Sequence, residues 1–170
     1  DLTSARAFYR DFLGFAEPYA LLNADGSPSM AFFKVNERQY IELFPEREAA
    51  TDRLHHIAIE TTGADAMRRY LASKGVKVPE NVGRGRIGNA NFTIVDPEGH
   101  TVEIVQYHPA GWTVREKGKH LPEGRVSSRI MHVGIIVTQF DAVMGFYTGV
   151  LGFTETWRGG RDPKVLSWVN

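Results

Sequence analysis

The sequence predicts an α+β fold built from repeated βαβββ modules, in which one strand, one helix and three further strands follow one another. Two internal repeats indicate this organisation. Residues 8–15 and 146–153 share five identities at an offset of 138, and residues 56–59 resemble residues 132–135 at an offset of 76. Self-similarity at a fixed offset is typical of a repeated structural unit. We therefore expect three related modules in the 170 residues of the chain.

Apolar residues recur three times at the spacing of an amphipathic helix, i, i+3, i+4 and i+7. A glycine follows each stripe, where many helices end in a left-handed residue. The pattern predicts three helices that each lie on a sheet. The stripes and their glycines are Ala5, Phe8, Tyr9 and Phe12 with Gly14; Met67, Tyr70 and Leu71 with Gly75; and Val143, Phe146, Tyr147 and Val150 with Gly152.

Short apolar runs bounded by turn residues predict the strands. Two of them flank the residues Asp-Pro-Glu-Gly at 96–99, a sequence typical of a hairpin turn. The expected strands lie at about residues 17–23, 29–35 and 38–44 in the first module, at 56–60, 91–95 and 101–107 in the second, and from residue 132 in the third.

These elements divide the chain into three parts. Residues 1–108 are expected to form two paired modules, of which the first lacks its opening strand and the second begins near residue 54. Residues 109–128 combine glycine, proline and charged residues, which is typical of a linker. Residues 129–170 are expected to begin the third module.

The composition excludes several classes of function. Twenty basic and 20 acidic residues cancel, so no net field attracts the chain to nucleic acid or to an anionic membrane. A small molecule is the expected partner. The chain has no cysteine, which leaves His, Asp and Glu as the strong metal ligands. Neither a membrane-length apolar run nor a signal peptide is visible, so a cytoplasmic location is expected.

Strand alternation predicts where the chemically useful side chains point. In the strand at 56–60 the isoleucines alternate with His56, which therefore lies on the face away from the helix. Glu103 and Glu42 have the same parity in their own strands, and His132 repeats the position of His56 in the third module. Each also has a structural interpretation: a histidine satisfied by the backbone, or a carboxylate on a solvated strand face.

Other side chains have simpler expected roles. The helix aromatics are assigned to the core, and three histidines in or near loops are assigned to the surface. Three aromatics share the face of the candidate ligands and could line a pocket. The core residues are Phe8, Phe12, Phe146 and Tyr147; the surface histidines are His100, His108 and His120; and the pocket candidates are Tyr40, Phe44 and Tyr107.

Two motifs carry a resemblance to a known superfamily. His56-Ile-Ala-Ile followed by Asp96-Pro-Glu-Gly-His-Thr-Val-Glu103-Ile, together with the segment at 8–15, resembles the vicinal oxygen chelate superfamily of glyoxalases, bleomycin-resistance proteins and extradiol dioxygenases. The resemblance implies that paired modules form a cup-shaped mixed sheet with helices outside. It also implies a divalent metal, Fe²⁺, Zn²⁺, Mn²⁺ or Ni²⁺, held by residues of the first and last strands of each module.

Carried over to this sequence, the resemblance assigns His56, Glu103 and Glu42 to the metal site of the paired modules. His132 is assigned to a site that the third module would share. Glu103 or Glu42 would also act as the base that moves a proton. A neutral imidazole and two carboxylates suit a divalent ion and leave positions open for water or substrate.

The sequence is compatible with three functions. The first is a metal enzyme that acts on a small oxygenated substrate by proton transfer or isomerisation. The second is an extradiol ring-cleaving dioxygenase, for which His132 would be a ligand. The third is a metal-free binder of the bleomycin-resistance kind. A homodimer is a possible partner arrangement, because an unpaired module would expose a sheet edge.

Overall fold

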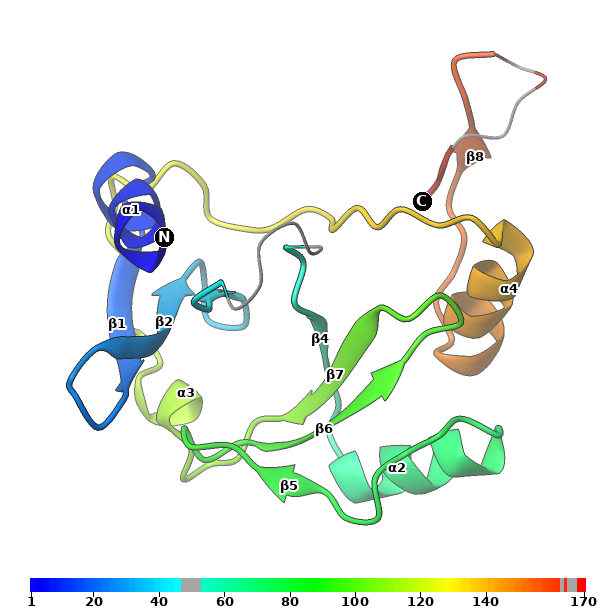
Figure 1. Ribbon diagram of the computed structural model, residues 1–170, viewed down its shortest axis with the longest axis horizontal. Helices are drawn as coiled ribbons and strands as arrows, with labels where there is room; N and C mark the ends of the chain where they lie inside the picture. The colour runs from blue at the N-terminus through cyan, green and yellow to red at the C-terminus, as the bar shows by residue number, and fades with distance from the viewer. Residues whose placement is uncertain (47–52, 163, 165–167) are drawn as a thin grey trace. The chain divides into compact units, whose positions relative to one another are not determined.

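The computed structural model describes residues 1–46, 53–162, 164 and 168–170. The chain divides into two compact units. Unit 1 comprises Asp1–His55, Arg84–Asn89 and Tyr107–Gly134, and unit 2 comprises His56–Gly83, Ala90–Gln106 and Ile135–Asn170. Helices and mixed sheets occur together (Figure 1), which confirms the predicted α+β class.

Unit 1 consists of a helical segment, a three-stranded sheet and one short helix. The sheet is antiparallel in the order β1-β2-β3. These elements are α1 (Leu2–Ala7), the π-helical segment η1 (Phe8–Phe12), β1 (Ala16–Leu22), β2 (Pro28–Lys34), β3 (Tyr40–Leu43) and α3 (Trp112–Arg115). The strands lie close to the predicted ranges, whereas α3 falls inside the segment predicted as a linker.

The core of unit 1 lies on one face of this sheet. Ala31 and Phe33 alternate along β2 with no exposed surface, and Tyr9 of η1 packs on Phe33 at 5.5 Å between ring centroids. Ile41 and Leu43 of β3 pack on the same cluster. Because strand side chains alternate, the other face of the sheet carries the remaining residues, among them Glu42.

Apart from Arg84, unit 2 contains the complete module, β4 (Ile57–Glu60), α2 (Ala64–Ser73), β5 (Gly83–Arg84), β6 (Ala90–Val95) and β7 (Thr101–Gln106). The sheet order is β4-β7-β6-β5, with β4 parallel and β6 antiparallel to β7. The remaining elements are α4 (Phe140–Met144), the π-helical segment η2 (Gly145–Val150), β8 (Arg158–Gly159) and β9 (Trp168–Val169). Strand β5 is the one element of the module that the sequence pattern did not predict.

Two helical segments cover one face of this sheet. Leu71 of α2 and Phe146 of η2 belong to the same buried cluster as Val102 and Ile104 of β7, and Ile57 of β4 packs against it. The exposure of β4 alternates between half-buried isoleucines and exposed Ala58 and Glu60. The predicted parity of this strand is therefore confirmed.

The first and third helical segments share an irregularity that spacing alone did not predict. In η1 the amide of Leu13 donates to Phe8 O at 3.0 Å, a bond between residues five apart, and in η2 Leu151 donates to Phe146 O at 3.0 Å. Each segment then ends at a left-handed glycine, Gly14 with φ 75° and Gly152 with φ 77°. The two copies therefore share local geometry as well as sequence.

Two expectations about single elements are wrong. Phe8 and Phe12 are exposed, Phe12 by 76%, and stack on each other at 5.4 Å rather than entering the core. Tyr9 and Leu13 take the core side in their place. No strand forms from His132 in the described residues, because a strand is defined by its pairing and residues 130–137 pair with no neighbour there.

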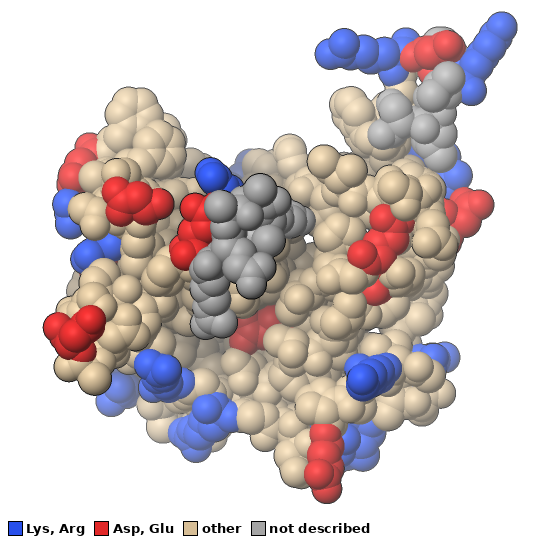
Figure 2. Space-filling model, viewed as in Figure 1, with Lys and Arg blue, Asp and Glu red and all other residues tan. Residues whose placement is uncertain are grey.

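The described surface is mixed in charge. Figure 2 shows acidic and basic side chains interspersed on the visible face, in keeping with their equal numbers. No helix among the described residues is long and apolar enough to span a bilayer.

Candidate functional site

The predicted ligands of the second module lie on the helix-free face of the unit 2 sheet. Glu103 stands on the central strand β7, where its Cα neighbours are Ala58 of β4 and Thr93 of β6. Val102 and Ile104, on either side of it in the chain, face the buried cluster. The alternation of β7 thus places the Glu103 carboxylate on the opposite face.

The structure brings His56 and Glu103 together. His56 directly precedes β4, and its Nε2 lies 3.2 Å from Glu103 Oε2. Both side chains are largely covered, at 13% and 16% exposure. The other carboxylate oxygen, Oε1, accepts a hydrogen bond from Asn91 Nδ2 at 2.5 Å. Asn91 lies on β6, and no pattern in the sequence distinguishes it.

The geometry of this pair fits a divalent metal. Two donor atoms that are 3.2 Å apart and each about 2.1 Å from one ion would subtend roughly 100° at that ion. This angle lies between the values of octahedral and tetrahedral coordination. The pair also combines an imidazole nitrogen with a carboxylate oxygen, which suits metals of intermediate softness.

The other two predicted ligands belong to unit 1. Glu42 lies on β3, half-buried, opposite Phe32 of β2. His132 is exposed and lies outside any strand. Among the described residues, no group of three or more potential ligands lies together. The structure therefore brings two of the four together, while Glu42 and His132 stay predictions.

The face of the unit 1 sheet opposite its buried core carries an aromatic cluster. Tyr19 of β1 contacts Phe32 at 5.5 Å and Trp112 of α3 at 5.2 Å, and Trp112 also meets Tyr40 at 6.1 Å. We call these four residues the aromatic face. Tyr40 was a pocket candidate in the sequence, but Trp112 was missed because it lies in a segment rich in glycine and proline.

Two further predicted pocket residues have other contacts. Phe44 stacks on the His55 ring at 4.4 Å, and Tyr107 donates its hydroxyl to Arg38 O at 3.4 Å. The Tyr40 hydroxyl is buried and has no hydrogen-bond partner among the described residues. Burial and the nearby Glu37 carboxylate raise the pKa of Tyr40 to about 12, so its hydroxyl remains a proton donor at neutral pH.

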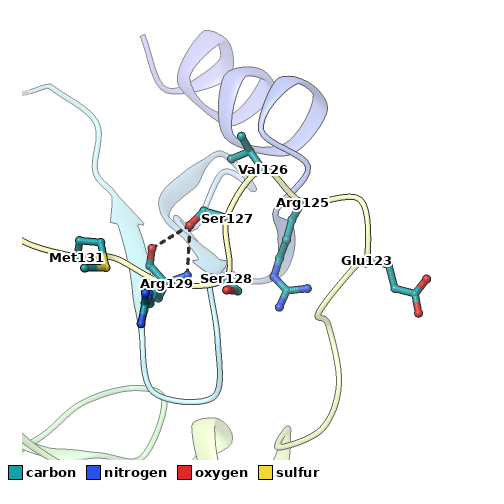
Figure 3. A pocket seen from close by; sticks show the side chains of 7 residues that line it. All are labelled: Glu123, Arg125, Val126, Ser127, Ser128, Arg129 and Met131. Carbon is teal, nitrogen blue, oxygen red and sulfur yellow. Dashed lines mark hydrogen bonds between the residues drawn. The ribbon is translucent and has the colours of Figure 1, made fainter.

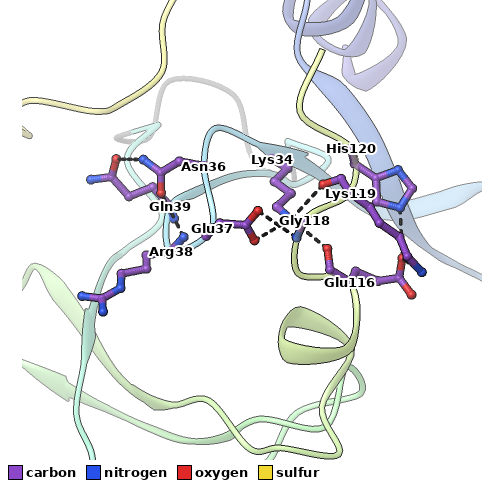
Figure 4. A network of polar contacts seen from close by, with 9 residues as sticks. All are labelled: Lys34, Asn36, Glu37, Arg38, Gln39, Glu116, Gly118, Lys119 and His120. Atoms are coloured by element: carbon purple, nitrogen blue, oxygen red, sulfur yellow. Dashed lines mark hydrogen bonds and ion pairs between the residues drawn. The ribbon is translucent and has the colours of Figure 1, made fainter. Parts of the chain in front are cut away.

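A buried lysine fastens α3 and the residues after it to the unit 1 sheet (Figure 4). Lys34 Nζ donates to the carbonyl oxygens of Glu116 and Lys119 at 2.9 Å each and to Glu37 Oε2 at 3.1 Å. The three donors of the ammonium group are thus all used. Lys34 therefore has a structural role and is no candidate for catalysis.

One open pocket of about 540 Å³ lies farther along this segment (Figure 3). None of the predicted ligands lines it. The lining residues are Glu123, Arg125, Val126, Ser127, Ser128, Arg129 and Met131. Arg125 donates to Pro122 O at 2.7 Å and Ser127 to Arg129 O at 2.9 Å, so part of its polar lining is occupied by local bonds.

His100 was assigned to the surface, but its ring is only 17% exposed. Its Nδ1 lies 2.8 Å from Oδ2 of the fully buried Asp96, whose other oxygen accepts the amides of Glu98 and His100 at 2.9 Å each. Tyr147 of η2 donates to Asp96 Oδ2 at 3.4 Å. The predicted hairpin turn therefore holds η2 as well as closing the hairpin.

Comparison with solved structures shows the fold of the chain in other proteins. A methylmalonyl-CoA epimerase in complex with methylmalonyl-CoA and NH₄⁺ is 25% identical, with a TM-score of 0.52, and the match covers 65% of this chain and 90% of that one. A methylmalonyl-CoA epimerase from Mycobacterium tuberculosis is 26% identical, with a TM-score of 0.51 and coverages of 64% and 82%.

A longer protein matches more of the chain. The Mn(II)-bound glyoxalase from Novosphingobium aromaticivorans is 22% identical, with a TM-score of 0.69, and the match covers 94% of this chain but 52% of that one. No curated protein sequence matches significantly. The model of the Glyoxalase/Bleomycin resistance protein/Dioxygenase superfamily matches residues 1–104. The chain, with its module of β4 to β7, belongs to that superfamily.

Proposed function

We propose that the protein is a divalent-metal enzyme that acts on a small oxygenated substrate by proton transfer, as in an isomerisation. The observation that carries the proposal is the 3.2 Å approach of His56 Nε2 to Glu103 Oε2 on the helix-free face of the unit 2 sheet. An unprotonated imidazole and a carboxylate at this separation are two ligands in place for one ion.

In this proposal each residue has a defined role. His56 and Glu103 hold the metal, and Glu42 or Glu103 accepts and returns the proton. The bound metal would supply Lewis acidity, which lowers the free energy of an enolate-like oxygen. Partial burial of His56 and Glu103 reduces their contact with water and strengthens their electrostatic interactions.

The similar solved structures support proton transfer over other reactions. Two of them are epimerases at 25% and 26% identity, and epimerisation inverts a stereocentre. The match to the first covers most of that chain. Since one scaffold hosts many chemistries, the substrate has to be identified by assay.

The test is the metal content of the protein purified without chelators, measured by plasma mass spectrometry. We expect stoichiometric metal in the wild type and its loss in the His56→Ala/Glu103→Ala double variant. A double variant of two exposed carboxylates, Glu80→Ala/Glu123→Ala, should retain the metal. Wild-type protein that stays metal-free after incubation with Mn²⁺, Ni²⁺, Zn²⁺ and Fe²⁺ would refute the proposal.

The aromatic face supports a second candidate, a metal-free binder of a planar ligand. Trp112, Tyr19 and Tyr40 group their rings on one face, and the Tyr40 hydroxyl has no hydrogen-bond partner among the described residues. Ligand pockets commonly combine apolar walls with a few polar groups. If this candidate is correct, Trp112→Ala lowers the affinity for an aromatic ligand in metal-free protein, whereas His56→Ala leaves it unchanged, as fluorescence titration would show.

A further inference from the structure

The Glu103 carboxylate lies between partners on both neighbouring strands. On one side His56, which precedes β4, approaches Oε2 at 3.2 Å. On the other side Asn91 of β6 donates its amide to Oε1 at 2.5 Å. Asn91 stands opposite Val105, two residues along β7 from Glu103, and such diagonal neighbours on one face of a sheet lie within side-chain reach.

We propose that Asn91 is a positioning residue that makes Glu103 a one-oxygen metal ligand. This inference rests on the proposed function, because it concerns the same metal. The hydrogen bond from Asn91 engages Oε1 and turns Oε2 toward His56. Glu103 would then bind the metal through Oε2 alone, and a coordination position that a two-oxygen carboxylate would fill stays open for substrate.

The physical argument concerns the rotation of the carboxylate. A glutamate side chain has three rotatable bonds, and its terminal torsion is soft, so an unheld carboxylate binds a metal through one oxygen or both. A hydrogen bond to a charged acceptor is about twice as strong as one between neutral groups. Partners that orient metal ligands in this way commonly change metal affinity by about 10–100-fold.

The inference also separates the roles of the two candidate carboxylates. A carboxylate fixed between an amide donor and a metal is poorly placed to carry a proton to and from a substrate. Glu103 is therefore assigned as a ligand rather than as the base. The sequence did not distinguish these roles, since both residues have the same parity on their strands.

The experiment compares Asn91→Leu with a matched control on the same strand and face, Thr93→Val. Thr93 is exposed and is the Cα neighbour of Glu103 across the β6–β7 pair. Calorimetric titration with Mn²⁺ should show about 10–100-fold weaker binding for Asn91→Leu and unchanged binding for Thr93→Val. Asn91→Ala, which lacks both the donor and the added bulk, should behave like Asn91→Leu and serves if that variant folds poorly.

A second measurement distinguishes positioning from a purely structural role. In protein loaded with Co²⁺, the visible absorption reports the coordination number and geometry of the ion. We expect the spectrum of Asn91→Leu to change, because both oxygens of Glu103 can then reach the metal, and that of Thr93→Val to match the wild type. Weaker Mn²⁺ binding with an unchanged Co²⁺ spectrum would overturn the positioning role.

The remaining outcomes separate this inference from the proposed function. If the wild type binds Mn²⁺ and Asn91→Leu binds it equally well, the inference fails and the metal enzyme stands. If the wild type binds neither Mn²⁺ nor Co²⁺, the proposed function fails and the inference fails with it.

Discussion

The Lys34 side chain connects strand β2 to a segment of unit 1 that lies far from it in the sequence. Its ammonium group is fully buried and bonds to two carbonyl oxygens more than 80 residues away in the sequence, those of Glu116 and Lys119. The segment that carries these two carbonyl groups directly follows α3, the helix that begins at Trp112 of the aromatic face. A buried cation is tolerated here because each donor has an acceptor.

Replacing Lys34 by Met should destabilise the protein by about 2–4 kcal/mol, because two carbonyl groups and the Glu37 carboxylate lose their buried donor. The measurement is urea unfolding followed by fluorescence. Lys119→Met serves as the control, since that side chain is 60% exposed and its surface ion pair contributes less than about 1 kcal/mol. Equal midpoints for the two variants would contradict the assigned role of Lys34.

The contacts of Asp96 should make the unfolding free energy of the protein depend on pH. Burial would raise its pKa, but hydrogen bonds from the His100 amide, the His100 ring and the Glu98 amide outweigh burial and lower the pKa from its usual 3.8. A carboxyl with a lowered folded-state pKa stabilises the fold above its unfolded-state pKa and loses this contribution as the pH falls through the folded value.

We therefore expect the unfolding free energy of the wild type to decrease below about pH 4, and Asp96→Asn to remove part of that decrease. At neutral pH the same variant should be less stable by about 1–3 kcal/mol. Denaturant titrations between acidic and neutral pH measure both effects. The control is the exposed Glu80→Gln, and a wild-type profile that parallels Asp96→Asn would show that the Asp96 contacts contribute nothing.

For single residues, the sequence periodicity predicted on which face of a strand a side chain lies, but not which residues that side chain contacts. The parity of His56 and Glu103 was correct because alternation in a strand follows from backbone geometry. Asn91 was missed because a polar residue on a half-exposed strand carries no pattern that marks its partner. Trp112 was missed because a one-turn helix is too short to give a periodicity.

Among the elements, the two repeated glycines offer a matched comparison. Gly14 and Gly152 have nearly the same φ, 75° and 77°, so alanine at either costs about 1–2 kcal/mol in backbone strain. A Cβ at Gly14 would also lie 3.1 Å from Arg125 Cα and from Gly124 O, whereas at Gly152 it would meet nothing within 4 Å.

Gly14→Ala should therefore lower the thermal midpoint more than Gly152→Ala. The additional cost at Gly14 is about 1 kcal/mol or more, since the crowding atoms are backbone and do not move aside as a flexible side chain would. Differential scanning calorimetry of both variants gives the comparison. Similar losses would mean that the segment around Arg125 shifts freely.

Apart from β5, the strands of both modules and the three helical segments were predictable, since each has a clear apolar pattern. The π-helical turns were not, because Phe8 and Phe12 are spaced as in an α-helix. The π-helical turn is wider than an α-helical turn. It directs Tyr9 and Leu13 to the core and leaves Phe12 exposed. The strand expected from His132 was wrong, because local sequence cannot show whether a pairing neighbour is present.

For the molecule as a whole, the proposed metal should couple binding to global stability. A ligand that binds only the folded state, at a free concentration of about 100 times its Kd, adds about 2.7 kcal/mol to the unfolding free energy. We expect Mn²⁺ to raise the melting temperature of the wild type and a chelator to reverse the rise. Glu103→Ala should show neither effect, and an equal rise in this variant would place the ion elsewhere.

The recurrent π-helical turn also bears on how the chain arose. A wide turn of this kind is rare in helices, yet it occurs in η1 and η2 with the same hydrogen bonds, 138 residues apart. Two independent origins of so unusual a feature at equivalent positions are far less probable than one. The shared turn is therefore a second likeness between residues 2–15 and 140–153 besides their sequence identities, and it is what the duplication of one module would leave.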